Sequence, residues 1–162
     1  MNTGLIWLKN ALRLNDNRVL INALKSTNTE AILPIYILNK NISDISNNRT
    51  KFLYESLIDL KSQLKYKFNS NLIILNGKPD EIFRKLLEDD LLNISEIFTD
   101  YSNRHSDIEY ENSLLNILSE KNSVDLHIVS KVNTLTNIEE IVEQENFKPP
   151  KTMKDMEKLF SK

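Results

Sequence analysis

The sequence predicts an α/β protein: a Rossmann-like three-layer sandwich in which helices cover both faces of a five-stranded parallel sheet. Short apolar segments of strand length alternate along the chain with longer segments whose apolar residues recur at helical spacing. The connections between them are short, which favours parallel strands joined by right-handed crossover helices. One segment, AILPIYIL at 31–38, is almost entirely apolar, as expected of a strand that is covered on both faces.

The first strand and helix come from the opening stretch of the chain. Leu5–Leu8 is apolar and leads into a loop that carries Lys9 and Arg13. Asn and Asp, which are helix-capping residue types, introduce a predicted helix over Asp16–Lys25. A strand that runs directly into such a loop and helix is how many nucleotide-binding α/β domains begin. The helix is expected to bury Val19, Leu20, Ala23 and Leu24.

The second strand is predicted over Ala31–Leu38, where Pro34 suggests a bulge or an edge position. A polar loop separates it from a long helix over Arg49–Lys67. The apolar positions of that helix fall at i, i+4, i+7 and i+11, which places them on one face. They are Leu53, Leu57, Leu60 and Leu64.

The second half of the chain repeats the alternation. The third strand, Asn71–Leu75, ends in a tight turn, and Pro79 opens the next helix, where its missing N–H costs nothing. That short helix is expected to bury Ile82, Phe83, Leu86 and Leu87. The remaining predicted elements are a strand over Glu96–Thr99, a loop over Asp100–Ser106, a helix through Leu118 and a fifth strand over Val124–Val129.

The tail differs in pattern from the preceding chain. An acidic helix is predicted over Asn137–Glu145, an extended linker over Phe147–Pro150 and an amphipathic helix over Thr152–Phe160. We therefore expect an α/β domain over 1–146 and, over 147–162, a linker and the start of a further helical segment. The apolar face of the last helix needs a partner, either this domain or another one. It consists of Met153, Met156, Leu159 and Phe160.

The composition excludes several kinds of site. Without cysteine there is no disulfide, thiolate nucleophile, iron–sulfur cluster or cysteine-ligated zinc. With only two histidines and two glycines, a histidine-rich metal site is not expected and a P-loop is excluded. We therefore assign no catalytic and no metal-binding residue. A net charge of −2 gives no overall attraction for nucleic acid, so a DNA contact would need a local patch or another domain.

The first residues lack the regions of a signal peptide, and no apolar run approaches the length of a membrane span. We therefore expect a cytoplasmic protein without membrane contact.

The opening stretch resembles the start of DNA photolyases and cryptochromes. In that family the N-terminal α/β domain begins with Trp-Phe-Arg-x-Asp-Leu-Arg-x-x-Asp-Asn-x-Ala-Leu. This chain keeps Trp7, Leu12, Arg13, Asp16, Asn17 and Leu20. It departs from the motif at Leu8, Lys9, Ala11 and Val19.

Further segments match the family in the same order. They are Leu33–Ile37; Arg49, Phe52, Leu53, Glu55, Ser56, Leu57 and Leu60; Leu72–Leu75 with Gly77 and Pro79; Tyr101; and Thr134-Leu135 with Glu139–Ile141. Because the matches cover essentially the whole chain, the sequence is identified as similar to the N-terminal α/β domain of the photolyase/cryptochrome family.

The resemblance implies a role in light-dependent repair of pyrimidine dimers or in blue-light sensing. In the family this domain holds an antenna chromophore, a reduced folate, a deazaflavin or a flavin, which passes excitation energy to FAD in a following helical domain. We find no counterpart of that helical domain before Lys162, and Trp7 is the only tryptophan, so the family's tryptophan relay is not present. We therefore expect this chain alone to lack deoxyribodipyrimidine photo-lyase activity, to use FAD only with a helical partner, and to meet DNA only through that partner. The expected docking surface is the apolar face of the tail.

The resemblance also implies where the antenna chromophore binds. Such sites lie by the carboxyl ends of the strands, which here are followed by segments 8–13, 38–41 and 101–107. The candidate chromophore-binding residues are Lys9, Arg13, Tyr101, Arg104, Ser106 and Asp107.

Each candidate has a plainer interpretation. Lys9 lies just past the first strand and is the best candidate for contact with a ligand; the alternative is a solvated lysine. For Arg13 we favour a pair with Asp16 that pins the loop to the helix. Tyr101 either stacks on a chromophore ring or packs in the core at a strand end.

The last of these loops also bears on the choice of chromophore. The folate-binding members of the family use an Asn–Glu pair there, and this chain has Arg104-His105 or Ser106-Asp107 according to register. The pair is not kept, which argues against a folate held in that way. Two alternatives to an antenna domain remain: a stand-alone module that binds flavin, folate or nucleotide, and a remnant without ligand. His105 is interpreted as a surface histidine and His127 as a core or strand-end residue.

Overall fold

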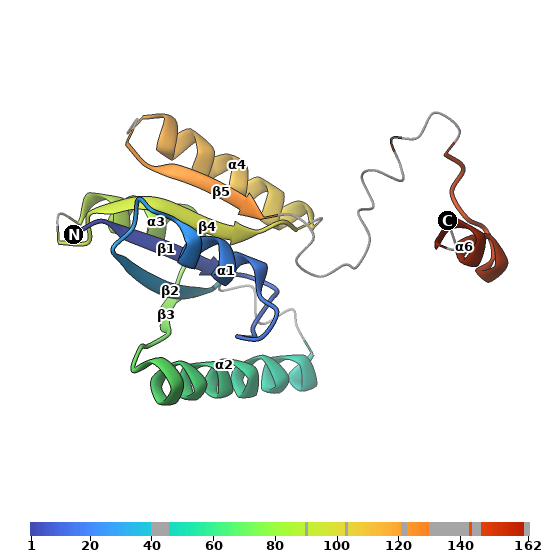
Figure 1. Ribbon diagram of the computed structural model, residues 1–162, viewed down its shortest axis with the longest axis horizontal. Coiled ribbons are helices and arrows are strands. Elements are labelled where there is room, and N and C mark those ends of the chain that lie inside the picture. The colour runs from blue at the N-terminus through green and yellow to red at the C-terminus, as the bar shows by residue number, and fades with distance from the viewer. Residues whose placement is uncertain are drawn as a thin grey trace.

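The predicted alternation of strands and helices is present in the structure, a computed structural model that describes residues 1–39, 46–89, 91–102, 104–120, 123–129, 143 and 147–160 (Figure 1). The strands are β1 (Thr3–Leu8), β2 (Ala31–Leu38), β3 (Ile73–Asn76), β4 (Ile94–Asp100) and β5 (Asp125–Val129). The helices are α1 (Arg18–Lys25), α2 (Asn47–Phe68), α3 (Pro79–Glu88), α4 (His105–Ser119) and α6 (Met153–Phe160). The predicted acidic helix at 137–145 and the family match at 134–141 fall almost wholly outside the described residues.

The five strands form one parallel sheet in the order β3-β2-β1-β4-β5. From β1 at the centre, the chain first winds outward through β2 to β3. It then returns to the other side of β1 and continues through β4 to β5. The direction of winding reverses between β1 and β4, so the switch point of this doubly wound sheet lies there.

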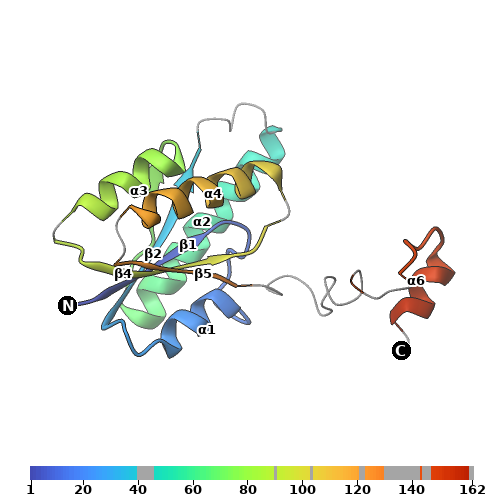
Figure 2. The same ribbon diagram turned by 90° about the horizontal axis from the view of Figure 1, so that it is seen from above.

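Helices cover both faces of the sheet, which confirms the three-layer prediction. On one face, α1 and α2 pack on Ile6, Leu8 and Phe98. On the other face, α3 and α4 pack on Leu5, Trp7, Ile35 and Ile97. Figure 2 shows α3 and α4 next to each other over the sheet. Consecutive residues of β1 thus alternate between two cores, as the period of a strand requires.

The predicted inner faces of the helices are mostly correct. In α2, Leu57, Leu60 and Leu64 are buried and Leu53 packs against them. The residues predicted for α3 all lie in or against the opposite core. In α1 the prediction is wrong for Leu24, which is 65% exposed. This helix has only eight residues and buries the face that carries Val19 and Ala23. Leu24 is the residue after Ala23 and lies on a different face of the helix, away from the sheet.

Pro34 occupies neither a bulge nor an edge strand. β2 pairs regularly with β1 through Ile6 and Pro34, and β2 is an inner strand. Pairing of β2 with β3 begins only at Ile35, so β3 does not pair with Pro34 and a missing N–H is tolerated there. The irregularity in register lies instead between Thr3 and Gly4, where β1 meets β4.

Asn17 forms the start of α1, as the capping residue types predicted. Its side-chain oxygen accepts hydrogen bonds from the backbone N–H groups of Val19 and Leu20, at 3.1 and 3.2 Å. Its amide nitrogen donates to the carbonyl oxygens of Ala11 and Arg13, at 3.1 and 2.8 Å. One buried side chain therefore caps the helix and folds the loop before it.

The last described segment contains α6, which both views show apart from the α/β body (Figures 1 and 2). Met153 is 82% exposed and Met156 is 39% exposed. The side chains of Leu159 and Phe160 lie outside the described part of the structure. Within that part, no helix is both long and apolar enough to cross a membrane.

Candidate functional site

A pocket of about 250 Å³ lies at the carboxyl ends of β1 and β2, beside the switch point of the sheet. The segments after β1, at the end of β2 and at the start of α4 all contribute to it, as the rule for parallel sheets predicted. Its lining residues are Trp7, Lys9 and Asn10; Tyr36, Ile37, Leu38 and Asn39; Arg104, Ser106, Asp107 and Tyr110; and Leu53 and Pro79.

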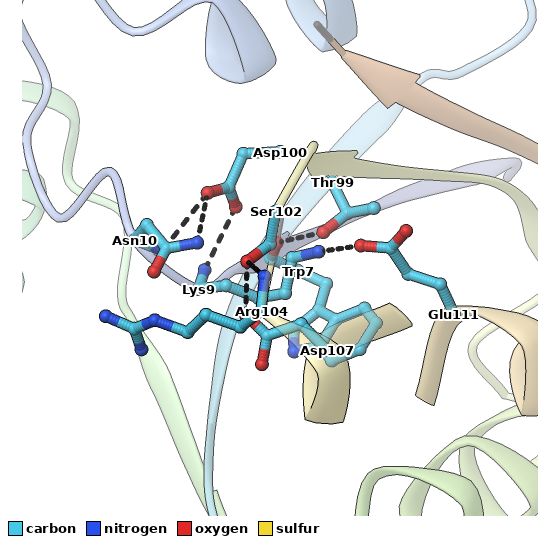
Figure 3. A network of polar contacts seen from close by, with 9 residues as sticks. All are labelled: Trp7, Lys9, Asn10, Thr99, Asp100, Ser102, Arg104, Asp107 and Glu111. Carbon is cyan, nitrogen blue, oxygen red and sulfur yellow. Dashed lines mark hydrogen bonds and ion pairs between the residues drawn. The ribbon is translucent and has the colours of Figure 1, made fainter. Parts of the chain in front are cut away.

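Asp100, at the end of β4, holds the loop that begins this site. Its buried carboxylate accepts hydrogen bonds from the backbone N–H groups of Lys9 and Asn10, both at 3.2 Å. It also accepts one from the Asn10 side-chain amide at 3.0 Å. These bonds tie the segment after β1 to β4 across the switch point (Figure 3).

Lys9 is buried in the floor of the pocket. Its side chain is 7% exposed, and its ammonium group forms an ion pair with Glu111 of α4, whose side chain is 8% exposed. The ammonium nitrogen also lies 5.0 Å from the centroid of the Trp7 ring, a cation–π distance. Figure 3 shows the two charged side chains pointing toward each other beside that ring. The alternative of a solvated lysine is therefore wrong.

The start of α4 forms another wall of the pocket. Ser102 donates a hydrogen bond to the Asp107 carboxylate at 2.6 Å and accepts one from the backbone N–H of Arg104 at 3.3 Å. Asp107 stands in the first turn of α4, where a negative charge interacts favourably with the helix dipole. These contacts fix the backbone that presents Arg104 and Ser106 to the pocket.

Tyrosine and amide groups add hydrogen-bonding capacity inside the pocket. Asn39, which follows β2, donates from its side-chain amide to the Tyr110 hydroxyl on α4. Burial raises the pKa of the Tyr36 phenol above its ordinary value; the Arg104 charge opposes that rise and the Asp107 charge adds to it. Tyr36 is thus a neutral phenol at physiological pH, close to one charge of each sign.

Four of the six predicted chromophore-binding residues line this pocket: Lys9, Arg104, Ser106 and Asp107. Arg13 is not among the lining residues; its guanidinium donates to the carbonyl oxygens of Asn15 and Asp16, both at 3.2 Å. Arg13 thus contacts its predicted partner Asp16 through the main-chain carbonyl of that residue, within the loop before α1. Tyr101 does not line the pocket and is 46% exposed, so the expected packing in the core is wrong.

The histidines lie outside the pocket. His105 is on the surface, as interpreted, with its Nε2 3.3 Å from Glu109. His127 is neither a core residue nor a strand-end residue: it lies in the middle of the edge strand β5, half exposed. Its ring stacks on Phe98, with centroids 4.7 Å apart, and its Nε2 lies 2.9 Å from the buried carboxylate of Glu96. Across the described ranges, no three His, Asp or Glu side chains are arranged to hold a metal ion.

The sequence did not single out several residues that line the pocket or, like Glu111, pair with a lining residue. Asn39 follows directly after β2 and Asn10 is the second residue after β1, so both carry nearly the same signal that identified Lys9. Glu111 shares a helix face with Leu114 and Leu118, so a carboxylate in that apolar stripe was a detectable sign of a buried partner. Tyr36 and Tyr110 carried no such sign, because tyrosine is common in ordinary strands and helices.

Comparison with known proteins gives the family. The family model for DNA photolyase matches residues 4–162 of this chain. The chain belongs to the DNA photolyase family. This photolyase-family chain is 31% identical to Cryptochrome-1 of Spalax judaei and of Macaca fascicularis, over 159 residues. It is 29% identical to Cryptochrome-2 of Gallus gallus over a segment of the same length. Each match covers 96% of this chain but only 26% of the relative, so the chain corresponds to their N-terminal domain.

Solved structures confirm the fold of this photolyase-family domain. A cryptochrome from Synechocystis superposes with a TM-score of 0.68 at 23% identity, over 78% of this chain and 27% of that one. A class III photolyase from Agrobacterium tumefaciens gives 0.69 at 21% identity, over 80% and 26%. An archaeal photolyase from Sulfolobus tokodaii, described with two FAD molecules and a novel light-harvesting cofactor, gives 0.63 at 19% identity, over 79% and 29%.

Proposed function

We propose that this chain is an antenna domain that holds a planar chromophore in the switch-point pocket, defined as the 250 Å³ pocket lined by Trp7, Lys9, Tyr36, Asn39, Arg104 and Tyr110. The observation that carries the proposal is the meeting of aromatic and polar side chains at the edge of the sheet where doubly wound folds bind ligands. The two FAD molecules and the light-harvesting cofactor described for the Sulfolobus tokodaii photolyase support this function.

The pocket fits one ring system. Its volume lies just below the roughly 300–1,000 Å³ of ordinary small-molecule sites, so it suits a ring rather than a whole dinucleotide. The Trp7 and Tyr36 side chains provide apolar surface for such a ring, and Asn39 and Tyr110 provide groups that donate and accept hydrogen bonds. Arg104 stands at the solvent-exposed rim, where it suits an anionic substituent. A flavin or deazaflavin meets these requirements, and the absence of the Asn–Glu pair counts against folate.

The chemistry divides between ligand and protein. A bound chromophore supplies absorption in the near ultraviolet and blue. The protein's own residues would hold the ring in place: Asp100 fixes the loop after β1, and Ser102 fixes the start of α4.

The test is direct binding of chromophores to the purified chain. We expect riboflavin or FMN to bind with a loss of ligand mobility, measured by fluorescence anisotropy, and Tyr36→Ala to weaken binding at least tenfold. Tyr54→Ala is the matched control, because Tyr54 is a half-exposed tyrosine on α2 outside the pocket. If neither flavin, deazaflavin nor reduced folate binds, the ligand-free remnant is the correct interpretation. Equal binding by Tyr36→Ala and the unaltered chain would place the ligand elsewhere.

The physiological setting is part of the proposal. The chain spans about a quarter of the length of its curated relatives, so FAD chemistry, DNA repair and light signalling belong to a longer assembly. We propose that a helical FAD-binding domain supplies them, docks on the apolar face of α6 and provides the contact with DNA, in the cytoplasm. The alternative of a stand-alone module is favoured if the chain binds chromophore yet has no helical partner; the coding sequence beyond Lys162 decides between them.

A further inference from the structure

The tryptophan of the switch-point pocket, Trp7, is able to quench the excited state of a light-absorbing ligand bound there by electron transfer. Trp7 lines the pocket, is 3% exposed and packs edge-on against Phe83, with ring centroids 4.9 Å apart. Indole is among the most easily oxidised rings of protein side chains. An electronically excited flavin-type ring is a strong oxidant. One electron passing from Trp7 to such a ring would leave an indole radical cation and a ligand reduced by one electron, and the excitation energy would be lost.

The same tryptophan carries a buried positive charge beside its ring. The Lys9 ammonium is 5.0 Å from the indole centroid, and its side chain is 7% exposed. A cation at this position attracts the neutral indole through its quadrupole but repels an indole radical cation. Because both groups are buried, water screens that repulsion much less than it would on the surface.

We propose that Lys9 protects the excited ligand by making Trp7 harder to oxidise. This inference rests on the proposed antenna function, since it concerns the same pocket. Lys9 is a positioning residue in this scheme: the protection comes from the effect of its charge on the Trp7 ring. Glu111 holds the ammonium over the ring. Its negative charge cancels part of the field that the ammonium exerts at Trp7, so only the uncancelled part of that field makes Trp7 harder to oxidise.

The rival explanation is that the Lys9–Glu111 pair only joins the β1 loop to α4. Replacing Lys9 alone would leave a buried, unpaired carboxylate and could unfold the chain. The informative variant is therefore Lys9→Met with Glu111→Gln, which removes both charges. Lys9→Arg keeps a cation at the site, and Trp7→Phe removes the electron donor. Circular dichroism checks that each variant is folded.

The first readout is the excited-state lifetime of riboflavin bound at saturation, which does not depend on affinity. In the unaltered chain, in Lys9→Arg and in Trp7→Phe we expect lifetimes within twofold of each other. In the Lys9→Met/Glu111→Gln variant we expect a lifetime at least fivefold shorter, restored when Trp7→Phe is added. The proposal is overturned if the double variant keeps the original lifetime, or if its lifetime is equally short without the tryptophan.

The second readout needs no bound ligand. Trp7 is the only tryptophan of the chain, so its one-electron oxidation by a freely diffusing photo-oxidant can be followed without interference from another indole. We expect the double variant to oxidise at a potential at least 59 mV lower, a tenfold shift in the equilibrium of a one-electron couple, and Lys9→Arg to show no shift. Failure of all chromophores to bind would refute the antenna proposal alone. Equal Trp7 oxidation potentials with and without the Lys9 charge would refute the proposal that Lys9 makes Trp7 harder to oxidise.

Discussion

At the scale of single residues, buried charged side chains hold the segments of the candidate site together: Lys9, Asp100 and Glu111. The sequence correctly placed Lys9 at the carboxyl edge of the sheet, because the residue that follows a parallel strand must lie there. It could not reveal that Glu111, 102 positions away, would pair with Lys9 and bury it. Periodicity assigns a residue to a face or an edge; a pair of this kind depends on how α4 crosses the sheet.

Asp100 gives a direct test of the network around the pocket. Replacing Asp100 with Asn puts an N–H donor opposite N–H groups that need an acceptor, so we expect a loss of about 2–4 kcal/mol in the free energy of unfolding. Urea unfolding followed by circular dichroism measures it. Asp125→Asn is the control, since the same change at an exposed position of β5 should stay within about 0.5 kcal/mol of the unaltered chain. An Asp100→Asn variant as stable as this control would contradict the role given to the carboxylate.

The buried phenol of Tyr36 leads us to predict how the free energy of unfolding changes at alkaline pH. Burial raises the pKa of its phenol in the folded chain, whereas in the unfolded chain the phenol titrates near its ordinary value of about 10. Above pH 10 the unfolded chain loses this proton first, so stability falls as the pH rises toward the folded-state pKa. We expect Tyr36→Phe to lose less stability than the unaltered chain between pH 9 and 11, which urea titrations at each pH would show. Parallel pH profiles for the two proteins would mean that Tyr36 ionises as freely when folded as when unfolded.

At the scale of elements, the strands and helices were predictable because their signals are local. The strand 31–38 was predicted with its observed bounds, since an unbroken apolar run ends at polar residues on both sides. Pro34 was misread because the tolerance for a proline depends on where the neighbouring strand begins to pair, which is information about the sheet. His127 was misread for a related reason: a strand alone does not show that it will lie at an edge.

Among the ends of the helices and strands, the N-cap of α1 is the position where a substitution has the clearest expected effect on stability. Asn17→Ala removes two accepted and two donated hydrogen bonds at a buried position, so we expect a loss of about 2 kcal/mol or more in thermal or urea unfolding. Asn22→Ala, an exposed asparagine in the same helix, serves as the control and should be neutral or slightly stabilising. Similar stabilities for the two variants would show that the loop folds without the Asn17 side chain.

At the scale of the whole molecule, the alternating pattern and the family resemblance predicted the five-stranded parallel sheet and the edge at which the pocket lies, but not the order of the strands. For the candidate site, the sequence predicted only the edge of the sheet at which it lies, not the pocket itself. Its pocket needs Tyr36 from one strand and Tyr110 from a helix that lies 74 positions later, and no local pattern links them. The tail could be predicted as amphipathic, but its partner could not.

The exposed apolar face of α6 predicts association or dye binding in the isolated chain. Met153 and Met156 offer apolar surface to solvent, so we expect fluorescence from an apolar-surface dye, or self-association in sedimentation experiments. Replacing both methionines with lysine should abolish either signal. Asn112→Lys with Asn116→Lys adds the same charge to exposed positions of α4 and should leave the signal intact. A monomeric chain that binds no dye would remove the support for a partner on this face.

The central position of β1 has a consequence for how the chain is made. Leu5 pairs on one side with Leu33 and on the other with Ile97, a residue 92 positions further along. During synthesis β1 therefore keeps one unpaired backbone edge until β4 leaves the ribosome, and pairing between strands so distant in sequence is slow to form. During that interval the nascent chain is open to faulty strand pairing with its neighbours. The strand order that places the pocket at the end of β1 thereby leaves this strand open to faulty pairing until β4 has been made.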